Sequence, residues 1–283
     1  MTNINTMANK KSDQRDMFNF GENWIAFLKL LNTDRIKQAE ISLRQMLQVD
    51  SLEGKSFIDI GSGSGMFSLA AKNLGATVIS FDFDYNSVKC TEYLREKFYP
   101  NDASNWQVFL ASVLDKNFMD SLPQADFVYS WGVLHHTGNM FEAMKNASKK
   151  VKPGGFLCIA LYRKTIFDKF WVRFKRMYSH SGKTTQRFFQ QFWALKTKIS
   201  FFVKGKSFKK MLIDYHENRG MDFYKDIHDW LGGYPYETIL PANCRLFFTE
   251  KGFVLSQQKI YNEGISKAIS SGCDEYLFKK NNL

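Results

Sequence analysis

Short apolar runs alternate with amphipathic stretches through the middle of the chain, from about residue 55 to residue 161. The runs have the length of buried strands, and the stretches between them place apolar residues at helical spacing. Strands are predicted at 55–60, 77–82, 106–111, 125–130 and 155–161, and helices at 64–74, 86–98 and 138–151. This alternation indicates a parallel sheet covered by helices on both faces. Residues 156–161 are apolar throughout, which favours a central place in the sheet, and residues 153–155 predict a tight turn before them.

The two ends of the chain carry shorter patterns. Residues 24–31 and 36–47 repeat apolar positions at helical spacing, and Thr33 with Asp34 forms a helix start signal between them, so two N-terminal helices are expected. Pro241 begins another predicted helix that runs to about residue 251. Strands at about 253–260 and 274–279 close the chain.

The net charge of +11 is concentrated in one aromatic-rich segment. Residues 163–219 hold fifteen Lys or Arg against three Asp or Glu, a net charge of +12, so the rest of the chain is close to neutral. Its first predicted helix places cations mostly on one side (Lys169, Arg173 and Arg176) and apolar residues on the other (166, 167, 170, 171, 174, 177 and 178). We interpret this segment as an insert, which divides the chain into N-terminal helices (1–50), an α/β core (51–162), the basic insert (163–236) and a closing segment (237–283).

Cysteine spacing and hydropathy indicate the compartment. The four cysteines form no C-x-x-C pair, so neither a disulfide framework nor a metal site is expected. Residues 1–16 are polar, and no apolar run approaches the ~20 residues of a membrane span. These features predict a cytoplasmic protein, and the basic insert raises peripheral attachment to a membrane surface as an alternative.

A glycine-rich turn joins the first predicted strand of the core to its first helix. Gly61, Gly63 and Gly65 lack a Cβ atom and can bring the backbone close to a nucleotide-like cofactor. NAD and ATP are both disfavoured, because Met66 stands where a dinucleotide loop needs glycine and a phosphate loop needs lysine. Asp82 ends the second strand, where a doubly wound sheet places an acid that binds ribose hydroxyls. A turn kept only for tight packing is the alternative.

Four segments in order resemble the successive motifs of class I S-adenosylmethionine (SAM)-dependent methyltransferases. They are FIDIGSGSG at 57–65, VISFD at 78–82, DFVYS at 126–130 followed by VLHH at 133–136, and VKPGG at 151–155. The resemblance implies a doubly wound, mostly parallel seven-stranded sheet of order 3-2-1-4-5-7-6, with the last strand antiparallel, and it implies SAM as the cofactor. Segments 20–24, 129–138 and 229–235 are further similar to a subgroup of uncharacterised bacterial methyltransferases.

The same resemblance assigns cofactor contacts. It implies that Asp59, Gly61 and Gly63 hold the methionine end of SAM and that Asp82 holds its ribose. Family members often carry an acid after the third strand for the adenine amino group, where this chain has Ser112, so Ser112 and the backbone of Val113 are expected there, with Asp115 as the alternative. The full set of expected contacts is Asp59, Gly61, Ser62, Gly63, Gly65, Asp82, Ser112, Val113 and Ser130.

Candidate catalytic residues follow the fourth and fifth strands of the core. His135, His136 and Tyr162 stand at carboxyl ends of strands, where α/β folds place their reactive side chains. A neutral histidine can accept a proton from an attacking hydroxyl, although a histidine here can also serve only as a helix cap or a packing residue. Residues 129–132 lack the Asn/Asp-Pro-Pro-aromatic sequence of nucleobase amino-methyltransferases, and the chain lacks the Pro-Cys pair of cytosine C5 enzymes. We therefore expect O-methylation of a small metabolite or a sugar- or lipid-linked compound, with N-methylation as the alternative.

Several alternatives stay open. The chain could be a SAM-binding module that acts through partners, or a methyltransferase that acts on RNA. The insert has three interpretations, namely a lid over the acceptor, a membrane-surface helix and an RNA-binding face. Its charge favours an anionic acceptor such as a phosphate-bearing compound. No oligomeric state is predicted.

Overall fold

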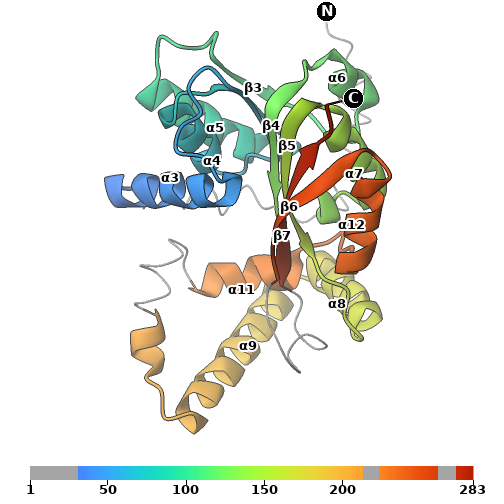
Figure 1. The fold of residues 1–283 in the computed structure, drawn as a ribbon. Helices are drawn as coiled ribbons and strands as arrows, with labels where there is room; N and C mark the ends of the chain where they lie inside the picture. The colour runs from blue at the N-terminus through green and yellow to red at the C-terminus, as the bar shows by residue number, and fades with distance from the viewer. Residues whose placement is uncertain (1–30, 213–222, 261–271, 283) are drawn as a thin grey trace, which may run out of the picture. The chain divides into compact units, whose positions relative to one another are not determined.

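A seven-stranded sheet is the centre of the computed structural model, which describes residues 31–212, 223–260 and 272–282 (Figure 1). Its strands are β1 (Ser56–Ile60), β2 (Thr77–Asp82), β3 (Trp106–Leu110), β4 (Ala125–Trp131), β5 (Val151–Tyr162), β6 (Phe253–Lys259) and β7 (Cys273–Lys280). They lie in the order β3-β2-β1-β4-β5-β7-β6. β1 to β5 pair in parallel, whereas β7 is antiparallel to both β5 and β6. The predicted sheet order is therefore confirmed.

The described chain divides into two compact units. One lies within Lys169–Tyr236 and is called the helical unit below. The other contains residues 31–168, 237–260 and 272–282 and is called the sheet unit. Each unit is built around apolar clusters of its own.

Helices cover both faces of the sheet in the sheet unit. On one face lie α3 (Thr33–Leu47), α4 (Met66–Asn73) and α5 (Tyr85–Phe98), and on the other lie α6 (Lys116–Ser121), α7 (Met140–Lys149) and α12 (Pro241–Thr249) (Figure 1). Leu43, Leu69 and Leu94 are buried against the first face, and Met144 and Phe248 against the second. The amphipathic stretches predicted from the sequence are thus the covering layers of a doubly wound fold.

The helix ends differ in part from the sequence prediction. α3 begins at Thr33 as expected, but its cap is Asn32, whose side chain accepts a hydrogen bond from the Arg35 amide at 2.9 Å. The expected helix at 24–31 falls almost wholly on residues 1–30, outside the described residues. α6 was not predicted, because six residues are too few to display a helical period.

The turn predicted at 153–155 is wrong in its position. Ala125 pairs with Val151 and Phe127 pairs with Phe156, so residues 152–155 lie opposite the single residue Asp126. Gly154 has a φ of 73°, a left-handed conformation that favours glycine. The glycine-rich segment therefore bulges inside β5 instead of preceding it.

A buried ion pair joins the carboxyl end of β5 to the start of β7. Arg163 follows β5, and its guanidinium makes a bidentate contact with Asp274, with Nε at 2.8 Å from Oδ2. Asp274 is fully buried and Arg163 is almost so. The pair fixes the register of the antiparallel strand at the edge where His135 and Tyr162 lie.

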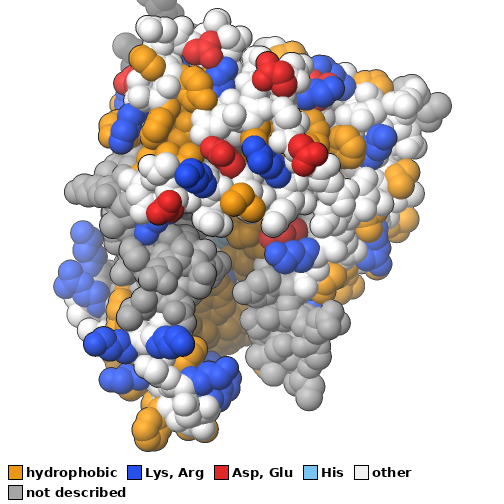
Figure 2. Space-filling model, turned by 60° about the vertical axis from the view of Figure 1, so that its left-hand side comes forward, with side chains coloured by type: hydrophobic (Ala, Val, Ile, Leu, Met, Phe, Trp, Pro, Cys, Tyr) orange, Lys and Arg blue, Asp and Glu red, His pale blue; other side chains and the backbone are white. Residues whose placement is uncertain are grey.

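The helical unit is held together by aromatic side chains. Its helices are α8 (Asp168–His180, which begins one residue before the unit), α9 (Lys183–Val203) and α11 (Phe223–Gly232). The ring of Trp230 lies 4.7 Å from those of both Trp171 and Trp193. Phe170 and Met177, expected on the apolar side of the first helix, are exposed instead, whereas Lys175 is buried with its ammonium 4.7 Å from the Trp230 ring centroid. Figure 2 shows many Lys and Arg side chains beside hydrophobic ones at the lower end of the view, where α9 lies.

Breaking the buried ion pair should destabilise the sheet unit. Arg163→Met removes the bidentate partner of a fully buried carboxylate, and we expect the free energy of unfolding to fall by about 3–5 kcal/mol. The double variant Arg163→Met/Asp274→Leu removes both charges and should recover most of that loss. Urea unfolding of the three proteins measures this, and a loss below about 1 kcal/mol for the single variant, the value of a surface pair, would contradict it.

Candidate functional site

The glycine turn between β1 and α4 is tightly enclosed. Gly61, Gly63 and Gly65 all have positive φ, at 76°, 55° and 80°. A Cβ atom on Gly61 would lie 2.5 Å from Val133, and one on Gly65 would lie 2.8 Å from the Cα atom of Thr91. At Gly61 and Gly65, conformation and space therefore both require glycine, and the segment after β4 packs directly against the turn.

The amide groups of this turn are used inside the protein. Gly61 and Ser62 donate to the carbonyl of Phe81, at 2.8 and 3.2 Å, and Gly65 donates to the carbonyl of Ser62 at 2.8 Å. Gly63 donates to a carboxylate oxygen of Asp82 at 2.9 Å. Phosphate-binding loops direct such amides at the ligand. Four of the five amides of the turn are thus engaged, and the carbonyls of Ser62 and Gly65 accept the amides of Gly65 and Leu69. The carbonyl oxygens of Gly61, Gly63 and Ser64 are the groups of the turn that suit a cationic ligand such as the ammonium and sulfonium groups of SAM.

Asp82 connects the turn to the end of β2. Its second carboxylate oxygen accepts the amide of Asp84 at 2.8 Å. Burial raises the pKa of Asp82 to about 6, and these amide hydrogen bonds oppose that rise. The Phe83 amide is a third backbone donor to this carboxylate. A carboxylate has about four acceptor positions, so three amides leave room for a hydroxyl donor such as that of a ribose. The position and chemistry of Asp82 fit the role that the sequence assigned to it.

Asp59 receives a chain of hydrogen bonds from three other elements. Trp106 in β3 donates from Nε1 to Ser80 Oγ at 2.9 Å, Ser80 in β2 donates to Ser68 Oγ at 2.7 Å, and Ser68 in α4 donates to Asp59 Oδ2 at 2.5 Å. All four residues are buried. Burial raises the pKa of Asp59 to about 7, the Ser68 bond lowers it, and the charge of Asp82 raises it further. The chain therefore stabilises a buried negative charge beneath the glycine turn.

Two of the serines expected to contact the cofactor, Ser62 and Ser130, have hydroxyls that bind other parts of the protein. Ser62 Oγ lies 2.9 Å from Thr91 Oγ1 in α5, and Ser130 Oγ donates to the carbonyl of Ile60 at 3.0 Å. Both serines are buried. Their hydroxyls connect the turn to α5 and β4, which is a supporting role.

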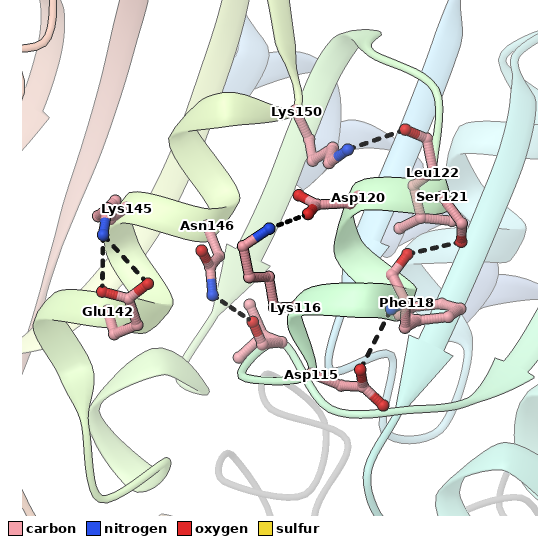
Figure 3. A network of polar contacts seen from close by, with 11 residues as sticks. Asp115, Lys116, Phe118, Asp120, Ser121, Leu122, Glu142, Lys145, Asn146 and Lys150 are labelled. Atoms are coloured by element: carbon pink, nitrogen blue, oxygen red, sulfur yellow. Dashed lines mark hydrogen bonds and ion pairs between the residues drawn. The ribbon is translucent and has the colours of Figure 1, made fainter.

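The segment after β3 is organised around the start of α6. Asp115 caps that helix by accepting the amide of Phe118 at 3.1 Å, and Asn146 in α7 donates to the carbonyl of Val113 at 3.0 Å (Figure 3). Ser112 Oγ accepts the amide of Leu114 at 3.1 Å. The three residues expected near adenine are thus brought together by local hydrogen bonds.

The candidate catalytic residues form one cluster at the carboxyl ends of β4 and β5. The ring of His135 lies 4.1 Å from that of Tyr162 and 4.4 Å from that of His136, between centroids. His135 is fully buried and its Nδ1 accepts the amide of Tyr162 at 3.4 Å. His136 and Tyr162 are partly exposed. Of the three, these two are therefore the side chains that an acceptor can reach.

Glu237, which is distant from this cluster along the chain, holds the histidine segment in place. Its carboxylate accepts the Met140 amide at the start of α7, at 3.0 Å from one oxygen, and its own amide donates to the carbonyl of His135 at 3.0 Å. Burial raises the pKa of Glu237, and these backbone amides oppose that rise. Glu237 therefore binds the backbone at both ends of the segment from His135 to Met140 and positions the histidines.

Several supporting residues were missed by sequence reasoning. Trp106, Ser68 and Thr91 lie on separate elements and meet the site only in the folded chain. Ser80 did carry a signal, because a serine within the apolar run of β2 needs a buried partner. Among the described residues, no group of three His, Cys, Asp or Glu side chains is arranged to hold a metal ion.

Removing the last hydroxyl of the buried chain should raise the pKa of Asp59. Ser68→Ala removes the hydrogen bond that favours the ionised carboxylate, so we expect Asp59 to titrate above about 7 in carboxyl-carbon NMR. Ser87→Ala, which changes another buried serine, is the matched control. An unchanged Asp59 titration in Ser68→Ala would contradict this account.

Asp59 should also impose a pH dependence on stability. Its pKa is higher in the folded chain than the ordinary value of about 3.9, so its contribution to the free energy of unfolding is greatest below pH 3.9 and is lost as the pH rises towards about 7. Asp59→Asn should abolish this component in urea unfolding measured across that range. The prediction fails if the wild-type and Asp59→Asn curves stay parallel.

Known proteins with similar sequences are methyltransferases. A family model described as a methyltransferase domain matches residues 32–215. A ubiquinone biosynthesis O-methyltransferase of Brucella melitensis is 27% identical over 115 residues, which cover 41% of this chain and 44% of that protein. A mitochondrial ubiquinone biosynthesis O-methyltransferase of Dictyostelium discoideum is 29% identical over 122 residues, covering 41% of this chain and 38% of that protein. The chain thus matches less than half the length of these relatives.

Two solved structures that share the fold contain SAH or AdoHcy. One is a magnesium protoporphyrin IX methyltransferase from Synechocystis PCC 6803 with bound SAH, which matches with a TM-score of 0.51 and 11% sequence identity. The match covers 87% of this chain and 83% of that protein's chain. PKMT2 from Rickettsia typhi, in complex with AdoHcy, has a TM-score of 0.55 and 13% identity and covers 87% of this chain and 53% of its own. At such identities the likeness concerns the fold. With the family match over most of the chain, it follows that this protein belongs to the class I SAM-dependent methyltransferase family.

Proposed function

We propose that the protein transfers a methyl group from SAM to a hydroxyl of a small metabolite or of a sugar- or lipid-linked compound. The observation that carries this proposal is the direct packing of Val133 against Gly61, because it joins the cofactor turn to the segment that bears His136. Cofactor groups and a candidate base therefore lie on one continuous edge of the sheet.

The chain's own residues suit the binding of SAM. The carbonyl oxygens of Gly61, Gly63 and Ser64 would meet its cationic end, and Asp82 would accept its ribose hydroxyls. Ser112 and Val113 would flank its adenine. When bound, SAM supplies a methyl group on a positively charged sulfur. Burial raises the pKa of Asp59 to about 7, and a cation bound above it would favour its ionised form. The turn would fix the direction from which an acceptor approaches the methyl group.

His136 is proposed as the general base, and Tyr162 as the residue that orients the acceptor. The rings of the two lie 5.5 Å apart between centroids and nearly perpendicular to each other. The imidazole of His136 would take the proton of an attacking hydroxyl, which leaves the oxygen as the nucleophile. His135, buried beneath them, would keep both rings in position.

A hydroxyl is favoured over a nitrogen acceptor for two reasons. A neutral amine needs no proton removed before it attacks, whereas a hydroxyl gains from the base that this edge of the sheet provides. The curated relatives are named O-methyltransferases, which supports the same choice. A SAM-binding module without turnover would need neither histidine.

Two substitutions test cofactor binding. Asp82→Ala removes the ribose acceptor and Gly63→Val forces a branched side chain into a left-handed turn position. We expect each to weaken S-adenosylhomocysteine binding at least tenfold in calorimetry, the value of about one charged hydrogen bond. Glu92→Ala, which changes a partly exposed acid on α5, is the control and should leave binding unchanged. Equal affinity in wild type and Asp82→Ala would remove the cofactor assignment.

Loss of the base should affect turnover and leave cofactor binding intact. His136→Ala should lower kcat roughly 100- to 10,000-fold with hydroxyl acceptors, the range of general-base catalysis. The affinity for S-adenosylhomocysteine should stay within about twofold of the wild-type value. Product formation from a panel of sugar, phenol and lipid-linked acceptors, with RNA included, measures both the rate and the acceptor class. A protein that binds SAM and methylates nothing in the panel would instead be a binding module.

A further inference from the structure

α9 in the helical unit has a second apolar face that points away from the unit's own core. Phe189, Trp193 and Ala194 lie on its inner side, within the aromatic cluster of the unit. On the outer side, six large apolar residues are each between 54% and 84% exposed. They are Phe188, Phe192, Leu195, Ile199, Phe202 and Val203. We call these six residues the α9 stripe.

The α9 stripe is continuous along the helix. Its first five members are spaced by four, three, four and three residues, which places them on one side of a helix with 3.6 residues per turn. Single exposed apolar residues are ordinary on protein surfaces, but a row that extends from Phe188 to Val203 is not. Such a row indicates a surface that is covered when the protein works.

Cations border the stripe on both sides. At 100° per residue, Lys196 falls on one flank, and Arg187 and Lys198 fall on the other. From residue 183 to residue 210 the sequence has eight Lys or Arg and no Asp or Glu. The partner of this face must therefore be apolar in the middle and negatively charged at its rim.

We propose that the α9 stripe docks on an anionic lipid bilayer, with the helix lying in the plane of the interface. Aromatic and aliphatic side chains would enter the boundary of the acyl chains while the flanking lysines and arginines meet the lipid head groups. No helix in the described part of the chain is long and apolar enough to cross a membrane.

Other occupants suit this face less well. A second copy of the chain would bring two cationic flanks together, because α9 has no acid with which to pair them. RNA would meet the lysines, and its bases could stack on the three phenylalanines of the stripe. Leu195, Ile199 and Val203 offer no ring and would stay exposed. A bilayer satisfies both the apolar row and its charged rim.

Vesicle binding by the intact protein tests the proposal. The protein should sediment with vesicles of phosphatidylcholine mixed with phosphatidylglycerol, and far less with phosphatidylcholine alone. Phe188→Ser/Phe192→Ser should weaken this binding at least about tenfold, because two buried aromatic rings are lost. Lys196→Glu/Lys198→Glu should also weaken it at least about tenfold, given roughly fivefold for each cation near the surface.

Matched variants in the sheet unit control for general effects of surface change. Leu246→Ser/Val254→Ser alters two apolar side chains that are each 58% exposed, and Lys37→Glu/Lys55→Glu makes the same change in net charge on exposed lysines. Both should bind vesicles as the wild type does. Absence of binding to anionic vesicles, or equal binding by stripe and control variants, would overturn the proposal. S-adenosylhomocysteine affinity, measured on the same proteins, reports separately on the proposed methyltransferase function.

Discussion

The cofactor side of this protein depends on the end of β2, where the carbonyl of Phe81 and the carboxylate of Asp82 together accept three amides of the glycine turn. These bonds hold the turn in left-handed conformations that favour glycine, and Val133 and Thr91 occupy the space that side chains would need. They also decide the chemistry of the turn. Amides that point inward cannot cradle a phosphate, whereas carbonyl oxygens that remain free can meet a cation.

This arrangement places two acids near each other inside the fold. Burial raises the pKa of both Asp59 and Asp82, so the ionised forms need compensation. Backbone amides stabilise the ionised form of Asp82, and the chain of hydrogen bonds that begins at Trp106 stabilises that of Asp59. A bound cation would add further compensation, since opposite charge at short range favours the ionised acid. A cofactor with a positively charged sulfonium would supply such a charge beside the two acids.

In the helical unit, α9 has two apolar sides with different surroundings. The inner side of α9 completes an aromatic cluster, while its outer side repeats apolar residues between cations. Stability of the helical unit explains the inner side but not the outer one, because an exposed apolar row adds nothing to folding. The positive charge that dominates the composition of the chain is therefore best understood together with this row.

The sequence by itself determined the strands, the covering helices other than α6, and the glycine turn, because these follow from local periodicity and from conformations that only glycine readily adopts. It also brought His135, His136 and Tyr162 to the correct edge, since parallel strands all end there. Tertiary structure decided which of them is reachable, that residues 152–155 bulge within β5, and that Asn32 caps α3. It likewise decided the partners of Asp59 and the outward face of α9. Those features depend on contacts between residues far apart in the chain, and a helix with two apolar sides does not reveal which side is buried until its neighbours are in place.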